Sequence, residues 1–114
     1  MKKWMYFFCK KLARSRDNDN IDYETMQRMI RENSGVVVMD VRTKDEFMYN
    51  HLSGAVNIPL QDISEDKIRQ FVGDKKRVII VYCEYGGRSK KACAKLKKYG
   101  YENVYNLDGG IENI

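Results

Sequence analysis

The sequence predicts an α/β fold, with a mostly parallel central sheet and helices on both of its faces. Short β-branched, apolar runs alternate with segments of helical three- and four-residue spacing from residue 21 onward. The chain has 114 residues, of which 43% are hydrophobic, and this is enough for one domain with its own core. We therefore expect a leader at residues 1–20 and one folded domain at residues 21–114.

The first half of the domain is expected to contain two helices and two strands. Asp22 has a side chain suited to an N-cap, and apolar residues then recur at helical spacing until Gly35. Thr43 and Glu46 have the spacing of a capping box, which predicts a short helix that carries Phe47. The expected strands are residues 36–41 and residues 55–58.

The second half continues the alternation. Ser64 can start a helix, and Gly73 can stop it. Three apolar residues of that helix are expected to face the core: Ile68, Phe71 and Val72. The remaining expected elements are a strand at residues 78–82, a helix at residues 88–99 and a strand at residues 104–107.

The charge of the chain is concentrated in the leader. Residues 1–20 hold six Lys and Arg against two Asp, and the rest of the chain holds 15 basic and 14 acidic residues. A nearly neutral domain argues against a nucleic-acid partner. We expect residues 1–16 to form a terminal segment that frays or packs on the core; the alternative is contact with an anionic membrane surface, because aromatic residues stand beside lysines there. No apolar run approaches the roughly 20 residues of a membrane span, so we expect a cytoplasmic protein, with peripheral membrane contact as the alternative.

The three cysteines are Cys9, Cys83 and Cys93. An odd number cannot form a full disulfide framework, which favours a reduced, intracellular setting. Cys93 shares an apolar helix face with Ala92 and Leu96, so we expect it to pack in the core. A role as a resolving thiol for Cys83 is the alternative.

Cys83 follows the most apolar strand and precedes a glycine-containing loop and a helix start. Gly86 and Gly87 can take positive φ, so that successive N–H groups turn inward. The helix start and the Arg88 guanidinium both favour thiolate over thiol, and comparable settings lower a cysteine pKa from about 8.5 to roughly 3.5–7.5. We expect a reactive nucleophile that is open to solvent; the other interpretation is a small buried side chain that ends the strand.

Two stretches resemble a known family. Residues 40–60 are similar to the pattern DVR…EF…H(I/L)xGAxNIP, and residues 81–89 are similar to YCxxGxRS. Residues 100–110 are similar to the element G(F/Y)xxVxxLxGG that follows. The chain therefore resembles a single-domain rhodanese, which is a sulfurtransferase fold, over nearly all of residues 21–111.

This resemblance implies a thiosulfate sulfurtransferase-like enzyme with catalytic Cys83 and Arg88. Cys83 would take sulfane sulfur from thiosulfate or from a persulfide of a protein or small molecule, and would pass it to a thiol or cyanide. The mechanism needs no metal and no organic cofactor. The loop residues expected to bind the substrate are Glu84, Tyr85, Gly86, Gly87 and Ser89.

The resemblance also marks Asp40, Arg42 and His51, which we interpret mainly as structural support. Asp40 and Arg42 are expected to form an ion pair at the end of a strand. His51, the only histidine, is expected to form a hydrogen bond at a corner of the chain and not to act as a base.

Three other interpretations are weighed against this one. Related dual-specificity phosphatases place five residues between the cysteine and the arginine, whereas four stand between Cys83 and Arg88. The shorter loop suits sulfur better than phosphate, which argues against phosphatase or arsenate reductase activity. A persulfide carrier without turnover and a rhodanese module that only binds proteins remain open. The charges of Glu84 and Arg88 are expected to cancel, which predicts modest activity with the dianion thiosulfate.

Overall fold

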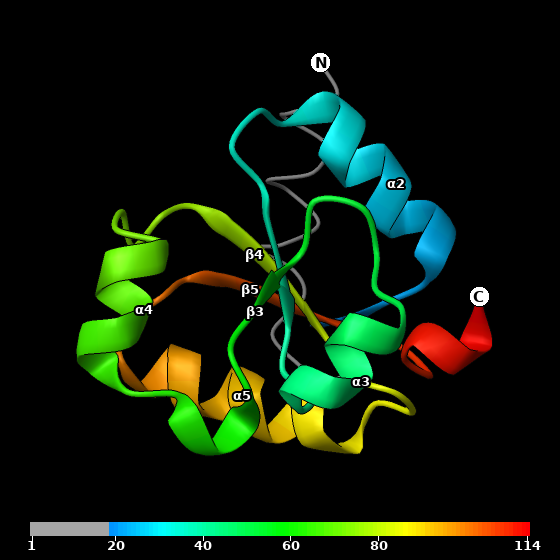
Figure 1. Ribbon diagram of the computed structural model, residues 1–114. Helices are drawn as coiled ribbons and strands as arrows, with labels where there is room; N and C mark the ends of the chain where they lie inside the picture. Colours follow the sequence, from blue (N-terminus) through cyan, green and yellow to red (C-terminus); the bar gives the residue numbers. More distant parts are fainter. Residues whose placement is uncertain (1–18) are drawn as a thin grey trace.

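The computed structural model describes residues 19–114 (Figure 1). The predictions for the leader, including membrane contact through residues 1–16, lie outside this part of the chain. Within it, five strands form one sheet in the order β1-β5-β4-β2-β3, and every neighbouring pair is parallel. The strands are β1 (Asn20–Ile21), β2 (Val37–Asp40), β3 (Val56–Asn57), β4 (Val78–Tyr82) and β5 (Asn103–Leu107).

Helices cover both faces of the sheet, which confirms the predicted α/β class (Figure 1). α4 and α5 pack on one face through Ile68, Ala92 and Leu96, and α2 packs on the other through Met26 and Met29. The helices are α2 (Tyr23–Glu32), α3 (Lys44–Tyr49), α4 (Glu65–Phe71) and α5 (Gly87–Lys98), with short 3-10 turns η2 (Leu60–Asp62) and η3 (Ile111–Asn113). Among the residues described, no helix has the length and apolar character to cross a membrane.

Three helix starts follow the capping residues that the sequence predicts. The Thr25 N–H donates to Asp22 Oδ1 over 2.8 Å, and Ser64 caps α4 in the same way. Thr43 and Glu46 form the reciprocal capping box: the Glu46 N–H donates to Thr43 Oγ1 over 3.2 Å, and the Thr43 N–H donates to Glu46 Oε1 over 2.9 Å. Each cap satisfies an N–H group that the helix itself leaves without an acceptor.

Some boundaries and one core residue differ from the prediction. Helix α2 ends at Glu32, before the predicted Gly35, because the backbone is already extended at Asn33. Phe71 was expected in the core, but its side chain is 48% exposed. It is the last residue of the seven-residue helix α4. The core positions in this region are taken by Ile68 of the helix and by Val72, which directly follows it.

The carboxyl ends of the central strands meet at one edge of the sheet. Asp40, the last residue of β2, lies opposite Tyr82, the last residue of β4. Cys83 therefore begins its loop at the edge where ligands bind in parallel sheets. The sheet also starts one residue earlier than the expected boundary of the domain, since Asn20 pairs with Asn106 of β5.

Candidate active site

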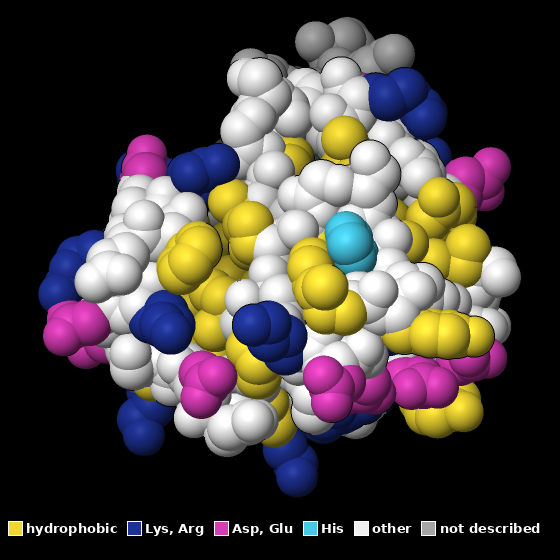
Figure 2. All heavy atoms as spheres, in the orientation of Figure 1, with side chains coloured by type: hydrophobic (Ala, Val, Ile, Leu, Met, Phe, Trp, Pro, Cys, Tyr) yellow, Lys and Arg dark blue, Asp and Glu magenta, His cyan; other side chains and the backbone are white. Residues whose placement is uncertain are grey.

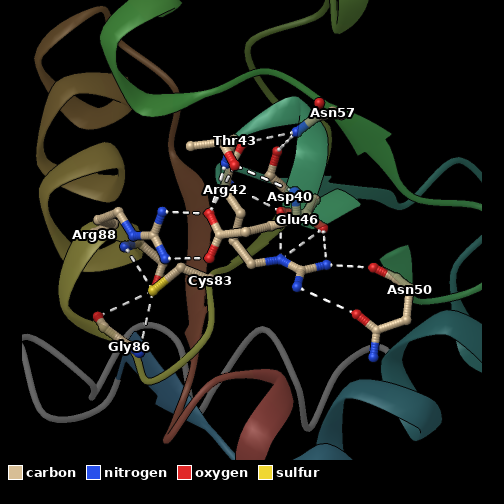
Figure 3. Close-up of polar contacts among 10 residues, drawn as sticks. Asp40, Arg42, Thr43, Glu46, Asn50, Asn57, Cys83, Gly86 and Arg88 are labelled. Carbon is tan, nitrogen blue, oxygen red and sulfur yellow. Dashed lines mark hydrogen bonds and ion pairs between the residues drawn. The ribbon is translucent and has the colours of Figure 1, made fainter. Parts of the chain in front are cut away.

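The Cys83 sulfur lies inside the loop between β4 and α5 (Figure 3). The N–H groups of Gly86 and Ser89 donate to Cys83 Sγ over 3.1 and 3.3 Å. The thiol itself donates to the Ser89 hydroxyl oxygen over 3.4 Å. Gly86 has φ +112°, in the left-handed region that favours glycine, and this turn brings its N–H group toward the sulfur.

The hydrogen bonds to Cys83 make its thiolate more stable than an ordinary one. Burial acts against them and raises the pKa of the thiol. The Ser89 hydroxyl and the N–H groups of Ser89, Gly86 and Arg88 lower it by more, so the pKa of Cys83 falls below its usual value. A lowered pKa was predicted from the same loop, and its direction agrees with this geometry.

Cys83 is buried, which differs from the expected access to solvent. The residue is 1% exposed and belongs to the same apolar cluster as Val81 and Leu96. The C-terminal segment is hydrogen-bonded to the backbone of the loop. The Ile111 N–H donates to the Cys83 carbonyl over 2.9 Å, and the Glu112 N–H donates to the Glu84 carbonyl over 3.0 Å. Cys83 therefore has the apolar surroundings expected of a small buried side chain and also the N–H groups expected around a nucleophile.

Gly110 allows this close approach of the C-terminal segment. A Cβ atom at this position would lie 2.3 Å from the Glu84 carbonyl oxygen and 2.6 Å from that of Cys83. Its φ of +69° is also left-handed. Side chains larger than hydrogen would push the loop away, so Gly110 helps to position Cys83. The sequence carried the signal in the glycine pair after the last strand, but we gave that pair no role in the site.

Arg88 forms an ion pair with Glu46 of α3 (Figure 3). Its two terminal nitrogens donate to the two carboxylate oxygens over 2.7 and 2.9 Å. Arg88 holds the pKa of Glu46 well below its usual range. We expected Glu84 to balance the charge of Arg88; the hydrogen-bonded partner is instead Glu46, which we had assigned only to the capping box.

Arg42 and Asp40 form a second, fully buried ion pair. Arg42 is 3% exposed and Asp40 is not exposed at all. Arg42 Nη2 donates to Asp40 Oδ2 over 2.7 Å and to the Asn50 carbonyl over 2.6 Å. The pair thus ties the end of β2 to the residue that follows α3, which is the geometry of a structural brace.

The Rhodanese-like domain family matches residues 22–114, with Cys83 and its loop inside that range. The chain belongs to this family. It is 34% identical over 93 residues to a sulfurtransferase of Allochromatium vinosum, covering 82% of this chain and 84% of that protein. It is 38% identical over 76 residues to the thiosulfate sulfurtransferase PspE of Escherichia coli, covering 67% of this chain and 71% of that one. Both of these relatives of the rhodanese-like domain carry the name sulfurtransferase.

A solved rhodanese from Escherichia coli, described with anions, has the same fold as this rhodanese-like domain. The TM-score is 0.63 at 34% sequence identity, with 69% of this chain and 91% of that one covered. The resemblance that the motifs indicated is confirmed by both kinds of similarity.

His51 is exposed on the surface of this rhodanese-like domain, with an apolar side chain beside it (Figure 2). Its Nδ1–H donates to the Phe47 carbonyl over 2.9 Å, and its ring stacks on the Phe47 ring with centroids 3.8 Å apart. Both contacts fasten the chain where α3 ends. They occupy the ring in the way expected of a corner residue.

The other loop residues lie in different settings. The Tyr85 side chain points outward and is 72% exposed, whereas Glu84 contributes its carbonyl to the contact with the C-terminal segment. Gly87 was expected to allow positive φ together with Gly86, but it begins α5 and its φ is not positive. A Cβ atom at Gly87 would meet open space, so only Gly86 of the pair needs to be glycine.

Cys93 lies on the buried face of α5, as the apolar pattern predicted. It is 6% exposed, and burial raises the pKa of its thiol to about 12. Such a thiol is almost entirely protonated near neutral pH. This setting favours packing over the alternative role of a resolving thiol.

Proposed function

We propose that this rhodanese-like domain transfers sulfane sulfur through a persulfide on Cys83. The observation that carries the proposal is the set of N–H groups from Gly86 and Ser89 on Cys83 Sγ, which lower the pKa of that thiol. A nucleophilic thiolate is what the first step of sulfur transfer requires. The sulfurtransferase names of the relatives support the same class of reaction.

The proposed reaction has two displacements. The Cys83 thiolate attacks the sulfane sulfur of the donor, a bond forms between the two sulfurs, and the donor leaves with the electron pair as sulfite or as a thiolate. A thiolate or cyanide then attacks the outer sulfur of the persulfide, and the Cys83 thiolate leaves. The loop N–H groups stabilise negative charge on sulfur before and after each step.

Cys83 is 1% exposed, so we propose that the loop opens before a donor reaches it. In the closed loop the Gly86 N–H donates to the sulfur, and the N–H groups of Ile111 and Glu112 donate to the carbonyls of Cys83 and Glu84. The ion pair between Arg88 and Glu46 is partly exposed, with side chains 38% and 28% accessible, so it can separate at low cost. An Arg88 released from Glu46 would then bind an anionic donor, which is the catalytic role that we propose for it.

The charge around the loop bears on the donor. Separation of the pair would free Arg88 to bind an anionic donor but would leave the Glu46 carboxylate nearby, so the site offers little net positive charge to a dianion such as thiosulfate. We propose a persulfide of a protein or small thiol as the natural donor and modest activity with thiosulfate. Replacing Glu84→Lys should raise the rate with thiosulfate more than the rate with a neutral persulfide donor. Equal changes with both donors would contradict the electrostatic argument.

Intact-mass measurement after incubation with a sulfane donor tests the proposal directly. The chain should gain the mass of one sulfur atom, and peptide mapping should place it on Cys83. Cys83→Ser should abolish the gain, while Cys93→Ser is the matched control that should retain it. Loading that survives Cys83→Ser would refute the persulfide assignment.

A carrier without turnover is the second candidate, and the burial of Cys83 favours it. Cys83 is 1% exposed, and a carrier would rely on a partner protein to open the loop. Repeated formation of thiocyanate from thiosulfate and cyanide by the isolated chain would support the enzyme. One sulfur loaded per chain without further turnover would support the carrier.

A further inference from the structure

The Ser89 hydroxyl has one hydrogen and several possible acceptors. Its oxygen lies 3.0 Å from the Gly86 carbonyl oxygen and 3.4 Å from Cys83 Sγ, and it also donates to Asn106 Oδ1. Ser89 is entirely buried and Asn106 is 2% exposed, so bulk water cannot substitute for these partners. The direction of this one hydrogen therefore depends on how strongly each neighbour accepts it.

Asn106 is held with its oxygen toward Ser89. It lies in β5, and its Nδ2 donates to Asn20 Oδ1 of β1 over 2.8 Å. With its amide nitrogen used there, Asn106 presents Oδ1 to the Ser89 hydroxyl. In the neutral state the Cys83 thiol then donates to Ser89, and Ser89 donates to Asn106.

Ionisation of Cys83 changes this arrangement. The thiol proton leaves to solvent, and Sγ becomes an acceptor for three donors: the N–H groups of Gly86 and Ser89 and the Ser89 hydroxyl. The hydroxyl keeps its own proton but must turn it from Asn106 toward the sulfur. This leaves Asn106 Oδ1 without that donor in a buried site, which disfavours the thiolate.

We propose that Asn106 is a positioning residue that competes with Cys83 for the Ser89 hydroxyl and so keeps the thiolate basic. Among similar thiolates, nucleophilicity rises with basicity, with a Brønsted coefficient of about 0.4–0.5. In a persulfide the inner sulfur carries no charge, so the hydroxyl returns to Asn106. The inference rests on the proposed function only in taking Cys83 as the nucleophile.

Replacing Asn106 changes no charge near Cys83, because its side-chain amide is neutral. The charged and titratable groups near Cys83 include Arg88, its partner Glu46, Glu84 of the loop and Cys93 of α5. Asn106 also lines a pocket of about 520 Å³ to which Asp19, Lys90 and Lys97 contribute. A substitution by leucine, which has a similar shape, removes Oδ1 as a competing acceptor together with the hydrogen bond to Asn20, and leaves the Gly86 carbonyl in place.

The test is the pH dependence of Cys83 alkylation by iodoacetamide, read at that residue by peptide mapping. In Asn106→Leu the pKa of Cys83 should fall by about half a unit to one unit. The rate at high pH should also fall about two- to threefold, because the thiolate is less basic. A general loosening of the fold would not produce both changes together.

Ser89→Ala supplies the matched control. In this background, which lacks the hydroxyl, Asn106→Leu should leave the pKa of Cys83 unchanged. The same shift in both backgrounds would overturn the proposal, because the effect would not pass through Ser89. A rise in the pKa, or no change, in the Asn106→Leu single variant would also overturn it.

Should Asn106→Leu not fold, the unaltered chain still decides the matter by nuclear magnetic resonance. The side-chain amide signal of Asn106 should titrate with the pKa of Cys83. The Asn57 side-chain amide, which donates to the Asp40 and Arg42 carbonyls, should stay constant. An Asn106 side-chain signal that does not change as Cys83 titrates would overturn the proposal. Since neither measurement needs sulfur transfer, their result is separate from that of persulfide loading.

Discussion

Two thiols in this domain share their burial and differ in their chemistry. Cys83 and Cys93 are 1% and 6% exposed, and both belong to one apolar cluster. Burial raises the pKa of both. Yet the pKa of Cys83 is lowered overall, whereas that of Cys93 rises to about 12.

The difference comes from the backbone around each sulfur. Cys83 ends a strand, and the turn at Gly86 leaves N–H groups that donate to Sγ. Cys93 lies in the interior of α5, where N–H groups are used by carbonyls of the preceding turn. The opposite pKa shifts of the two thiols are therefore set by the free N–H groups of a loop and not by a difference in exposure to water.

The largest expected effect is the difference in labelling between the two thiols. At pH 7, iodoacetamide should label Cys83 about a thousandfold or more faster than Cys93, since each pKa unit changes the thiolate fraction tenfold. Peptide mapping at several times measures both rates in one sample. In denaturant the two rates should become equal. Similar rates in the folded chain would refute the comparison.

Gly110→Ala should come next, because a Cβ atom there meets the carbonyls of Cys83 and Glu84. The loop must shift and lose N–H contacts to the sulfur, so labelling of Cys83 at pH 7 should fall more than tenfold. The free energy of unfolding should fall by about 1–3 kcal/mol, as measured by denaturant titration.

Gly87→Ala is the matched control for that prediction. Its Cβ atom would meet open space, and alanine is favoured over glycine within helices by up to about 1 kcal/mol. Labelling should stay near the original rate. Equal losses in both variants would show that the close approach of Gly110 does not position the loop.

Ser89→Ala should raise the pKa of Cys83 by up to about one unit, because one of its donors is removed while the backbone N–H remains. Labelling at pH 7 should fall by up to about tenfold. Ser64→Ala is the control: it removes the cap of α4 and lowers stability by about 1 kcal/mol without moving the pKa of Cys83. An unchanged pKa of Cys83 in Ser89→Ala would contradict the assignment of the Ser89 hydroxyl as a donor to the sulfur.

Glu46→Gln should have the smallest effect. Glutamine can keep the capping box but not the charge, so unfolding should become easier by about 0.5–1 kcal/mol at pH 7. Arg88 lowers the pKa of Glu46 in the folded chain, so the stabilisation is present above the unfolded pKa of about 4.3. It is lost as pH falls through the lower folded value, and the two chains should then converge in stability. A constant difference down to low pH would contradict the ion pair.

The features that the sequence predicted are those that depend on residues close together in the chain. The capping box of Thr43 and Glu46 follows from a spacing of three residues, and the strand Val78–Tyr82 follows from one unbroken apolar run. The loop that donates N–H groups to Cys83 was also predicted from adjacent residues, as were its turn at Gly86 and the helix start that follows.

Contacts between distant segments could not be predicted in the same way. Arg88 and Glu46 are 42 positions apart, and nothing local marks them as partners. Asn106 reaches Ser89 only because β5 lies beside β4. The contacts of Ile111 and Gly110 with the Cys83 carbonyl also arise from tertiary packing.

Both outer strands of the sheet, β1 and β3, are only two residues long. Long strands dominate the interior, where each is paired on both sides. An edge this short offers another chain few backbone groups with which to extend the sheet. The short edge strands therefore disfavour edge-to-edge aggregation of the described part of the chain. The apolar strand β4, which is rich in β-branched residues, lies at the centre of the sheet and not at an edge.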